Sequence, residues 1–179
     1  MSVAAACAAG CAALTPAAER TPTSETSIGI FYQPGAPELR DLWRDGDPGE
    51  PFSLRGRVID GNGAPVAGAE VELWHADAYG AVHADRYRTR LRTGADGAFS
   101  VRTAYPGHIP EAPGVWGARH IHIIVTHPDY RQLISLILFK GDERLAGWER
   151  PDLSIFVEQA QVKGEALRFG QVEIIVEAN

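Results

Sequence analysis

Two histidines separated by one residue mark residues 119–122, which read Arg-His-Ile-His. Side chains two positions apart share one face of a β-strand, so His120 and His122 are expected to point the same way from a segment rich in Ile and Val. Two imidazoles on an apolar face are costly unless partners satisfy their nitrogens. A metal ion would do so, and imidazole suits Fe, Cu, Zn or Ni. The alternative is one structural histidine bonded to the backbone and one exposed histidine.

The segments that would position this pair have the pattern of short strands. Tight-turn residues occupy 61–65 and 94–97, and no helical periodicity persists, apart from a single turn that residues 38–43 could form. The pattern predicts an all-β protein with the two-sheet β-sandwich architecture. The strands are expected at residues 53–60, 69–75, 98–103, 119–126, 132–139, 153–162 and 169–177.

Composition narrows the functional classes. The chain has 179 residues, 45% of them apolar and 22% charged, and a formal net charge of −6. This length favours one domain with its own core. An acidic chain without a basic run is a poor candidate for nucleic-acid binding, and no apolar stretch approaches the roughly 18 residues of a membrane helix. The two cysteines, Cys7 and Cys11, lie near the N-terminus, so neither a disulfide-built fold nor a thiolate metal site in the core is expected.

Residues 1–26 are expected to form a flexible, Ala-rich extension before a single domain at residues 27–179. The first cation is Arg20, and Leu14 is the only large aliphatic residue after Val3 within the first 20 residues. A secretory signal peptide would open with Lys or Arg and continue through a strongly apolar run. We therefore predict a cytoplasmic protein.

Longer motifs accompany the histidine pair. They include Phe-Tyr-Gln-Pro-Gly-Ala-Pro at 31–37, Leu-Arg-Gly-Arg-Val-Ile-Asp at 54–60, Val-Glu-Leu-Trp-His-Ala-Asp at 71–77 and Phe-Lys-Gly-Asp at 139–142. Together with the His-Ile-His motif, these segments resemble the intradiol ring-cleavage dioxygenases of the catechol and protocatechuate type. The resemblance runs from about Ser27 to the C-terminus. It implies a β-sandwich of that family.

The resemblance also implies a chemistry. In that family, two Tyr and two His hold a non-haem Fe(III), and the enzymes use O₂ to open a catechol between its hydroxyls. Phenolates suit Fe(III) because hard anionic oxygens stabilise the higher charge. His120 and His122 match the family's histidine pair.

The tyrosines of the family are not matched. The first should lie eight residues after Trp74, where this chain has Val82, and the second is replaced by Ile109. Neither side chain can bind a metal. Tyr79 and Tyr105 lie nearby, but each would need a local shift in strand register to take a vacant position.

Each vacant position has a histidine beside it, His83 and His108 respectively. A metal site built from these two and the His120–His122 pair would have four neutral ligands, which favour Fe(II), Cu or Zn over Fe(III). The alternative is that both added histidines are loop residues in water.

Arg119 and Tyr79 are further candidates for catalysis. The family's Arg three residues before the first histidine is replaced by Gly117, and Arg119 is the nearest substitute. Arg119 could stabilise a developing anion, or form only a surface ion pair. Tyr79 and Trp116 could wall a pocket for an aromatic substrate, although simple packing would also explain them. His75 is expected to be a hydrogen-bonded core histidine.

We therefore predict a metal-dependent oxygenase that acts on a small catecholic or phenolic substrate with O₂. Two other functions stay open. One is an isomerase, cyclase or lyase on the same scaffold that uses a His or Tyr as acid–base catalyst. The other is a non-catalytic β-sandwich binding module. No nucleic-acid or membrane partner is expected, and the oligomeric state is open, a homodimer included.

Overall fold

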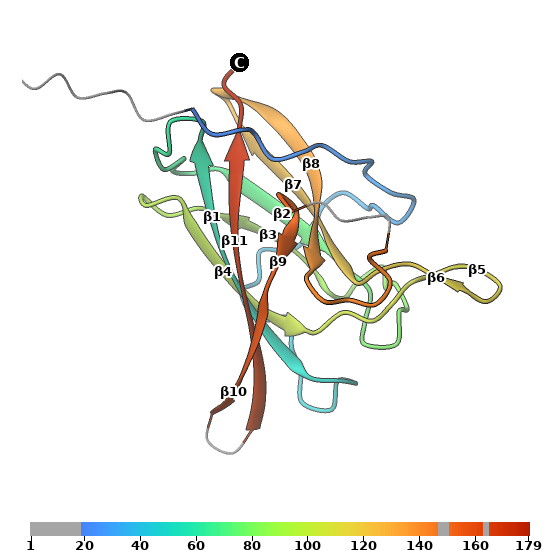
Figure 1. Cartoon of the computed structure of the whole chain (residues 1–179). Helices are drawn as coiled ribbons and strands as arrows, with labels where there is room; N and C mark the ends of the chain where they lie inside the picture. Colours follow the sequence, from blue (N-terminus) through green and yellow to red (C-terminus); the bar gives the residue numbers. More distant parts are fainter. Residues whose placement is uncertain (1–18, 147–150, 163–164) are drawn as a thin grey trace, which may run out of the picture.

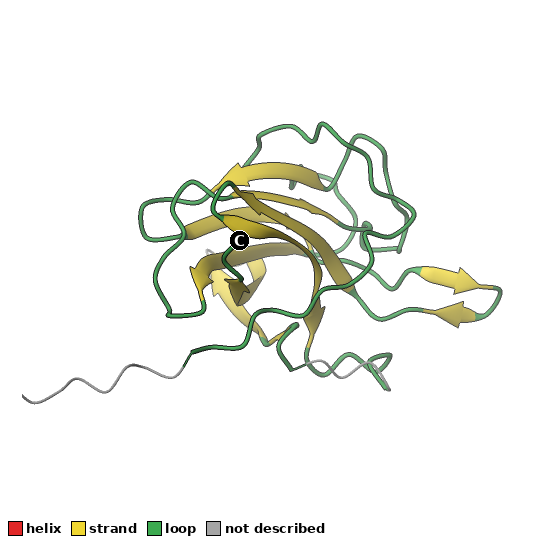
Figure 2. Ribbon diagram, turned by 90° about the horizontal axis from the view of Figure 1, so that it is seen from above, coloured by secondary structure: helices red, strands yellow, loops and turns green. Residues whose placement is uncertain are grey.

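The computed structural model describes residues 19–146, 151–162 and 165–179 (Figure 1). These residues form strands and no helix, which confirms the predicted all-β class. The strands make two sheets that pack face to face, together with one small hairpin (Figure 2). Cys7 and Cys11 fall outside the described residues. Within the described ranges, no helix is long and apolar enough to cross a lipid bilayer.

The first sheet has the strand order β10-β11-β1-β4. Within it, β1 pairs parallel to β11 and antiparallel to β4, so it lies at the centre of the sheet. The strands of this sheet are β1 (Pro51–Asp60), β4 (Ala98–Ala104), β10 (Val157–Val162) and β11 (Glu165–Val176).

The second sheet has the order β3-β2-β7-β8-β9 and carries the histidine pair on its central strand. A separate hairpin, formed by β5 (Pro110–Ala112) and β6 (Val115–Trp116), precedes that strand. The hairpin projects from the body of the sandwich in both views (Figures 1 and 2). The strands of the second sheet are β2 (Glu70–Trp74), β3 (Arg88–Arg92), β7 (His120–His127), β8 (Tyr130–Phe139) and β9 (Ser154–Ile155).

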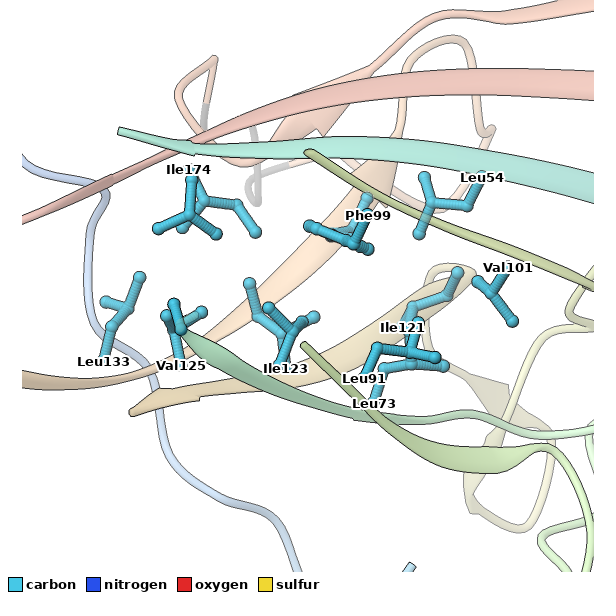
Figure 3. Packing of buried hydrophobic residues seen from close by; sticks show 14 of the residues in the cluster. Leu54, Leu73, Leu91, Phe99, Val101, Ile121, Ile123, Val125, Leu133 and Ile174 are labelled. Atoms are coloured by element: carbon cyan, nitrogen blue, oxygen red, sulfur yellow. The ribbon is translucent and has the colours of Figure 1, made fainter. Parts of the chain in front are cut away.

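The core lies between the two sheets and is built from alternate residues of each strand. Figure 3 shows Leu54, Phe99 and Ile174 of the first sheet facing Leu73 and Ile123 of the second. All five are almost completely buried. Because successive side chains on a strand point to opposite faces, the inward position of Ile121 and Ile123 turns His120 and His122 to the outer face of the second sheet.

Several strands differ from those expected from the sequence. The region expected to be one strand at 153–162 is divided, with β9 pairing with β8 in one sheet and β10 pairing with β11 in the other. Phe156, between them, is 70% exposed. Strands β3, β5 and β6 were not expected, because β3 alternates Arg with Thr and Leu and the other two are very short.

The segment before residue 27 is partly docked on the sandwich. The Thr23 backbone N–H donates to Ile175 O on β11 at 2.9 Å, and the Thr26 N–H donates to Ile134 O on β8 at 2.9 Å. Ser135 Oγ donates to Ser24 O at 2.6 Å. Residues 23–26 therefore contact both sheets, although the expected extension ended at residue 26. Its first 18 residues lie outside the described part.

Candidate metal centre

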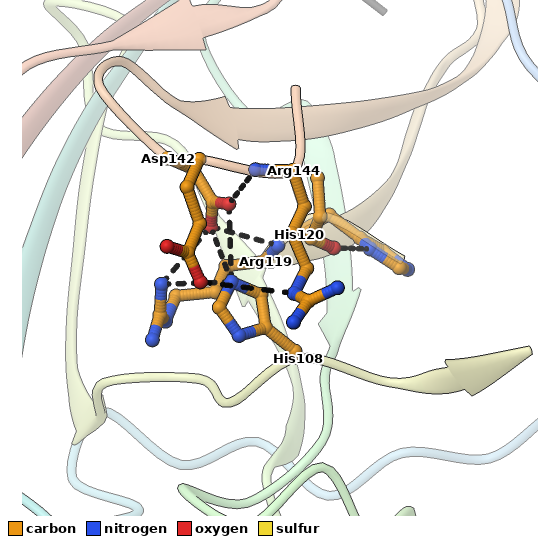
Figure 4. Close-up of polar contacts among 7 residues, drawn as sticks. His108, Arg119, His120, Asp142 and Arg144 are labelled. Carbon is orange, nitrogen blue, oxygen red and sulfur yellow. Dashed lines mark hydrogen bonds and ion pairs between the residues drawn. The ribbon is translucent and has the colours of Figure 1, made fainter. Parts of the chain in front are cut away.

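The histidine pair converges at its Nε2 atoms. His120 Nδ1 lies 2.8 Å from Ala118 O, so this nitrogen carries the proton and donates to the carbonyl (Figure 4). The two Nε2 atoms lie 3.2 Å apart. Two imidazoles that bind one metal at about 2.1 Å and near a right angle have nitrogens about 3 Å apart. The backbone bond to Nδ1 is the outer contact that fixes a metal-binding histidine. This geometry fits two neighbouring ligands of one metal ion.

His122 is held in place by packing. Its ring stacks on Trp74, with ring centroids 4.9 Å apart and an interplanar angle of 2°. Tyr32 packs on the same indole at 5.0 Å. Gly29 also lies close to the ring, because an added Cβ there would lie 2.9 Å from His122 Cε1. The buried Nδ1 of His122 has no hydrogen-bond partner among the described residues.

Burial also keeps both imidazoles neutral. Burial, together with the neighbouring His120, lowers the pKa of His122 to about 3. Burial likewise lowers the pKa of His120, and its bond to Ala118 O offsets only part of that effect. Metal ions bind neutral imidazole, so neither histidine has to lose a proton before binding at neutral pH.

A pocket of about 400 Å³ opens over the pair. Pockets of this size bind small organic ligands. Its wall combines two leucines of β8 and Leu153, directly before β9, with residues of the N-terminal segment and one residue of the β5–β6 hairpin. The lining residues are Glu25, Thr26, Ser27, Glu111, His120, His122, Leu136, Leu138 and Leu153.

The nearby tyrosines do not reach this pocket. Tyr79 is 76% exposed on the loop after β2. Tyr105 packs edge-on against Phe52 and Phe139, at centroid distances of 5.7 and 5.0 Å. Among the described residues, neither tyrosine contacts the histidine pair or lines its pocket. A shift in register that would bring Tyr79 or Tyr105 to a vacant ligand position is therefore not seen.

The two additional candidate histidines are bonded to aspartates. His83 Nε2 lies 2.8 Å from Asp77 Oδ2, and His108 Nε2 lies 3.0 Å from Asp142 Oδ1. In the described part of the chain, no group of three or more His, Cys, Asp or Glu side chains is close enough to hold a metal. The four-histidine set is therefore not assembled, because each added ring is held by its own carboxylate. A ligand role for His83 and His108 stays a prediction.

Arg119 pairs with a buried carboxylate, in contrast to the surface ion pair considered above. Its Nη1 donates to Asp142 Oδ2 at 3.1 Å, and the Asp142 side chain is 1% exposed (Figure 4). Burial raises the pKa of Asp142, but bonds from the Arg144 N–H and from His108 outweigh it and keep the pKa low.

Trp116 is 41% exposed on β6 and does not line the pocket. The catalytic roles of Arg119 and Tyr79 stay predictions.

The sequence did not predict the stacking of Trp74 on His122 or the presence of Glu111 in the pocket wall. The alternation along residues 69–75 was a usable signal for the stacking, because it turns Trp74 away from the core, and Trp74 is the cross-strand partner of His122. Glu111 had no such signal, because it lies in a hairpin whose strands are two and three residues long.

The family model and the relatives that this chain matches are all dioxygenases. Residues 30–153 match the model of a family described as dioxygenase. The 6-chlorohydroxyquinol 1,2-dioxygenase of Cupriavidus pinatubonensis is 35% identical over 146 residues, which cover 69% of this chain and 52% of the relative. Catechol 1,2-dioxygenase 2 of Acinetobacter lwoffii is 34% identical over 170 residues, which cover 79% and 61%. This chain thus spans between half and two thirds of the length of these relatives.

Solved structures agree with the fold. The 3-chlorocatechol 1,2-dioxygenase of Rhodococcus opacus superposes with a TM-score of 0.79 at 25% identity. The superposed region covers 89% of this chain and 74% of that one. The dioxygenase domain of a Streptomyces dioxygenase carbohydrate-binding protein fusion superposes with a TM-score of 0.78 at 28% identity, covering 89% of this chain and all of that domain.

Proposed function

The chain belongs to the intradiol ring-cleavage dioxygenase family, and on this premise we propose that it is an atypical metal-dependent oxygenase. Its substrates would be O₂ and a small catecholic or phenolic compound. The observation that carries the proposal is the convergence of the His120 and His122 Nε2 atoms, 3.2 Å apart, beneath a pocket of about 400 Å³.

The family implies a non-haem iron, and the residues present fit only part of its centre. The histidine pair fits a metal, since both rings are neutral and one is oriented by a backbone carbonyl. The two tyrosinate positions do not fit, because the sequence motifs assign them to Val82 and Ile109 and, among the described residues, no tyrosine lines the pocket. A ferric centre with two phenolates is therefore not supported. Neutral ligands favour Fe(II), with Cu or Zn as alternatives.

The pocket supplies what an aromatic substrate needs. Leu136, Leu138 and Leu153 give it an apolar wall, and the histidine pair provides its polar end. Such a combination of apolar lining with a few polar groups fixes the orientation of a small ligand. We propose that the ring of the substrate lies against the leucines, with its hydroxyls toward the histidines.

Oxygen uptake tests this function. The purified protein, loaded anaerobically with Fe²⁺, would be given a panel of catechols and hydroxyquinols while O₂ and substrate are followed together. We expect equimolar consumption of both. His120→Ala should lower the rate by at least about 100-fold, since loss of a direct ligand exceeds the 10–100-fold cost of losing an outer contact. His127→Ala, at the far end of β7, is the matched control and should keep the rate.

Other outcomes would point to the other functions. Substrate loss without O₂ uptake would mean a non-redox enzyme on this scaffold. Binding of a phenol without turnover, in a protein that takes up no metal, would mean a binding module.

A further inference from the structure

We propose that Glu111 is a third ligand, so that His120, His122 and Glu111 form a two-histidine, one-carboxylate site for a divalent cation such as Fe²⁺. This inference rests on the proposed metal role of the histidine pair. Two histidines and one carboxylate on one face of a metal leave open positions, which is the arrangement found in non-haem Fe(II) oxygenases.

The position of Glu111 is the first support. It is the middle residue of β5 in the hairpin and lines the same pocket as His120 and His122. Within the described residues, Glu111 makes no hydrogen bond or ion pair, so its carboxylate is free to bind a cation.

Gly117 is the second support. In the family this position carries an Arg, whereas here an added Cβ would lie 2.4 Å from Glu111 Oε1. The Gly117 N–H donates to Ile109 O at 2.8 Å, which fixes the backbone at the base of the hairpin. The glycine thus removes a cation and leaves the space that the Glu111 side chain occupies. The close approach of Glu111 to Gly117 therefore links the loss of the family's Arg to the presence of this carboxylate.

Charge is the third support. Val82 and Ile109 remove two anionic ligands relative to the family's centre, and a single carboxylate restores one negative charge. A site with one anion and two neutral imidazoles suits a divalent cation better than a trivalent one.

Closure of the site requires a small movement. The described residues contain no ready-formed group of three donors, so the Glu111 carboxylate must turn toward the two Nε2 atoms when a cation binds. Glu111 is exposed on a two-stranded hairpin and its side chain has free torsions, so this turn is cheap. Glu25, the other carboxylate of the pocket, is bound to Arg131 at 3.2 Å and is the weaker candidate.

Cobalt titration tests the proposal. Metal-free protein would be titrated with Co²⁺ by calorimetry, and its visible ligand-field bands recorded. We expect one site in the wild type and at least about tenfold weaker binding, with altered bands, in Glu111→Gln. Glu143→Gln, an exposed carboxylate outside the pocket, is the matched control and should bind as the wild type does.

The outcomes separate this inference from the proposed function. If His120→Ala abolishes Co²⁺ binding but Glu111→Gln does not change it, Glu111 is not a ligand and only this inference fails. If Glu25→Gln weakens binding while Glu111→Gln does not, the third ligand is Glu25 and the inference is again overturned. If His120→Ala binds Co²⁺ as the wild type does, the proposed metal function fails as well. Near-UV circular dichroism of each variant would confirm that it is folded.

Discussion

His75 directly follows β2, next to the cross-strand pair of Trp74 and His122, but it faces the opposite side of the second sheet from His122. His122 lies on the outer face beside Trp74, whereas His75 turns inward, where its Nε2 lies 2.8 Å from Thr103 Oγ1 and its Nδ1 lies 2.7 Å from Ala76 O. The expectation of a hydrogen-bonded core histidine at position 75 is confirmed. The His75 imidazole is therefore structural, whereas His122 Nε2 faces only His120 Nε2 among the hydrogen-bond partners in the described residues.

The buried His75 should make stability depend on pH. Burial lowers the pKa of His75 to about 4 in the folded chain, against about 6.5 when unfolded. Between these values the unfolded state binds the proton and the folded state does not, so the free energy of unfolding should fall as pH drops from 6.5 toward 4. The slope is about 1.4 kcal/mol per pH unit for one histidine. Urea unfolding at several pH values would measure it.

His75→Gln removes this titrating ring and should flatten the slope over that window. His127→Gln, outside the core at the end of β7, is the control and should keep the wild-type slope. Equal slopes in all three proteins would show that His75 does not govern stability there.

At the scale of elements, β1 is packed too closely to accept a side chain at its centre. Gly56 pairs with Phe99 of β4, and an added Cβ would lie 2.0 Å from Phe99 Cζ. Gly56→Ala should destabilise the fold by about 1–3 kcal/mol, the usual cost of overpacking a core. Thermal or urea unfolding would measure the loss, with Arg55→Ala on the exposed face of β1 as control.

A double variant would show whether the Phe99 ring is the cause. Gly56→Ala combined with Phe99→Leu should cost less than the sum of the two single changes, because the smaller side chain makes room for the methyl group. If the cost of the double variant equals the sum of the two single costs, the strain in Gly56→Ala does not come from the Phe99 ring.

The strands that could be predicted are those with apolar alternation or a continuous apolar run, such as β1, β7 and β8. The alternation of apolar residues did not predict strands whose bounds depend on which neighbouring strand they pair with. The segment 153–162 reads as one strand, but β9 and β10 belong to different sheets. The same limit applies to Glu111, whose place beside the histidines depends on how the hairpin packs.

At the scale of the whole molecule, the N-terminal segment ties the two sheets together and helps to enclose the site. Thr23 Oγ1 accepts the Ile175 N–H at 2.9 Å on β11, while Thr26 contacts β8, and both Thr26 and Ser27 line the pocket. The sequence of this segment has neither alternation nor helical periodicity, so its docking could not be predicted. The sandwich itself followed from the strand patterns.

Thr23→Val should therefore destabilise the protein by about 1–3 kcal/mol, because it leaves the Ile175 N–H without its acceptor. Thr23 is buried, whereas Thr21 is exposed, so Thr21→Val is the matched control. Urea unfolding would compare the two variants. If Thr23→Val were as stable as Thr21→Val, the segment would not hold the sheets together.

The most direct test of the proposed metal centre is metal analysis of the purified protein, with a visible absorption spectrum of the same sample. We expect one metal ion per chain, bound after incubation with Fe²⁺, and no strong tyrosinate-to-iron charge-transfer band, because no tyrosine lines the pocket in the described part of the chain. A strong band would contradict the proposed histidine-based centre by showing that a tyrosine is a ligand. Failure to bind Fe, Cu or Zn would contradict it at its base, by showing that the histidine pair holds no metal.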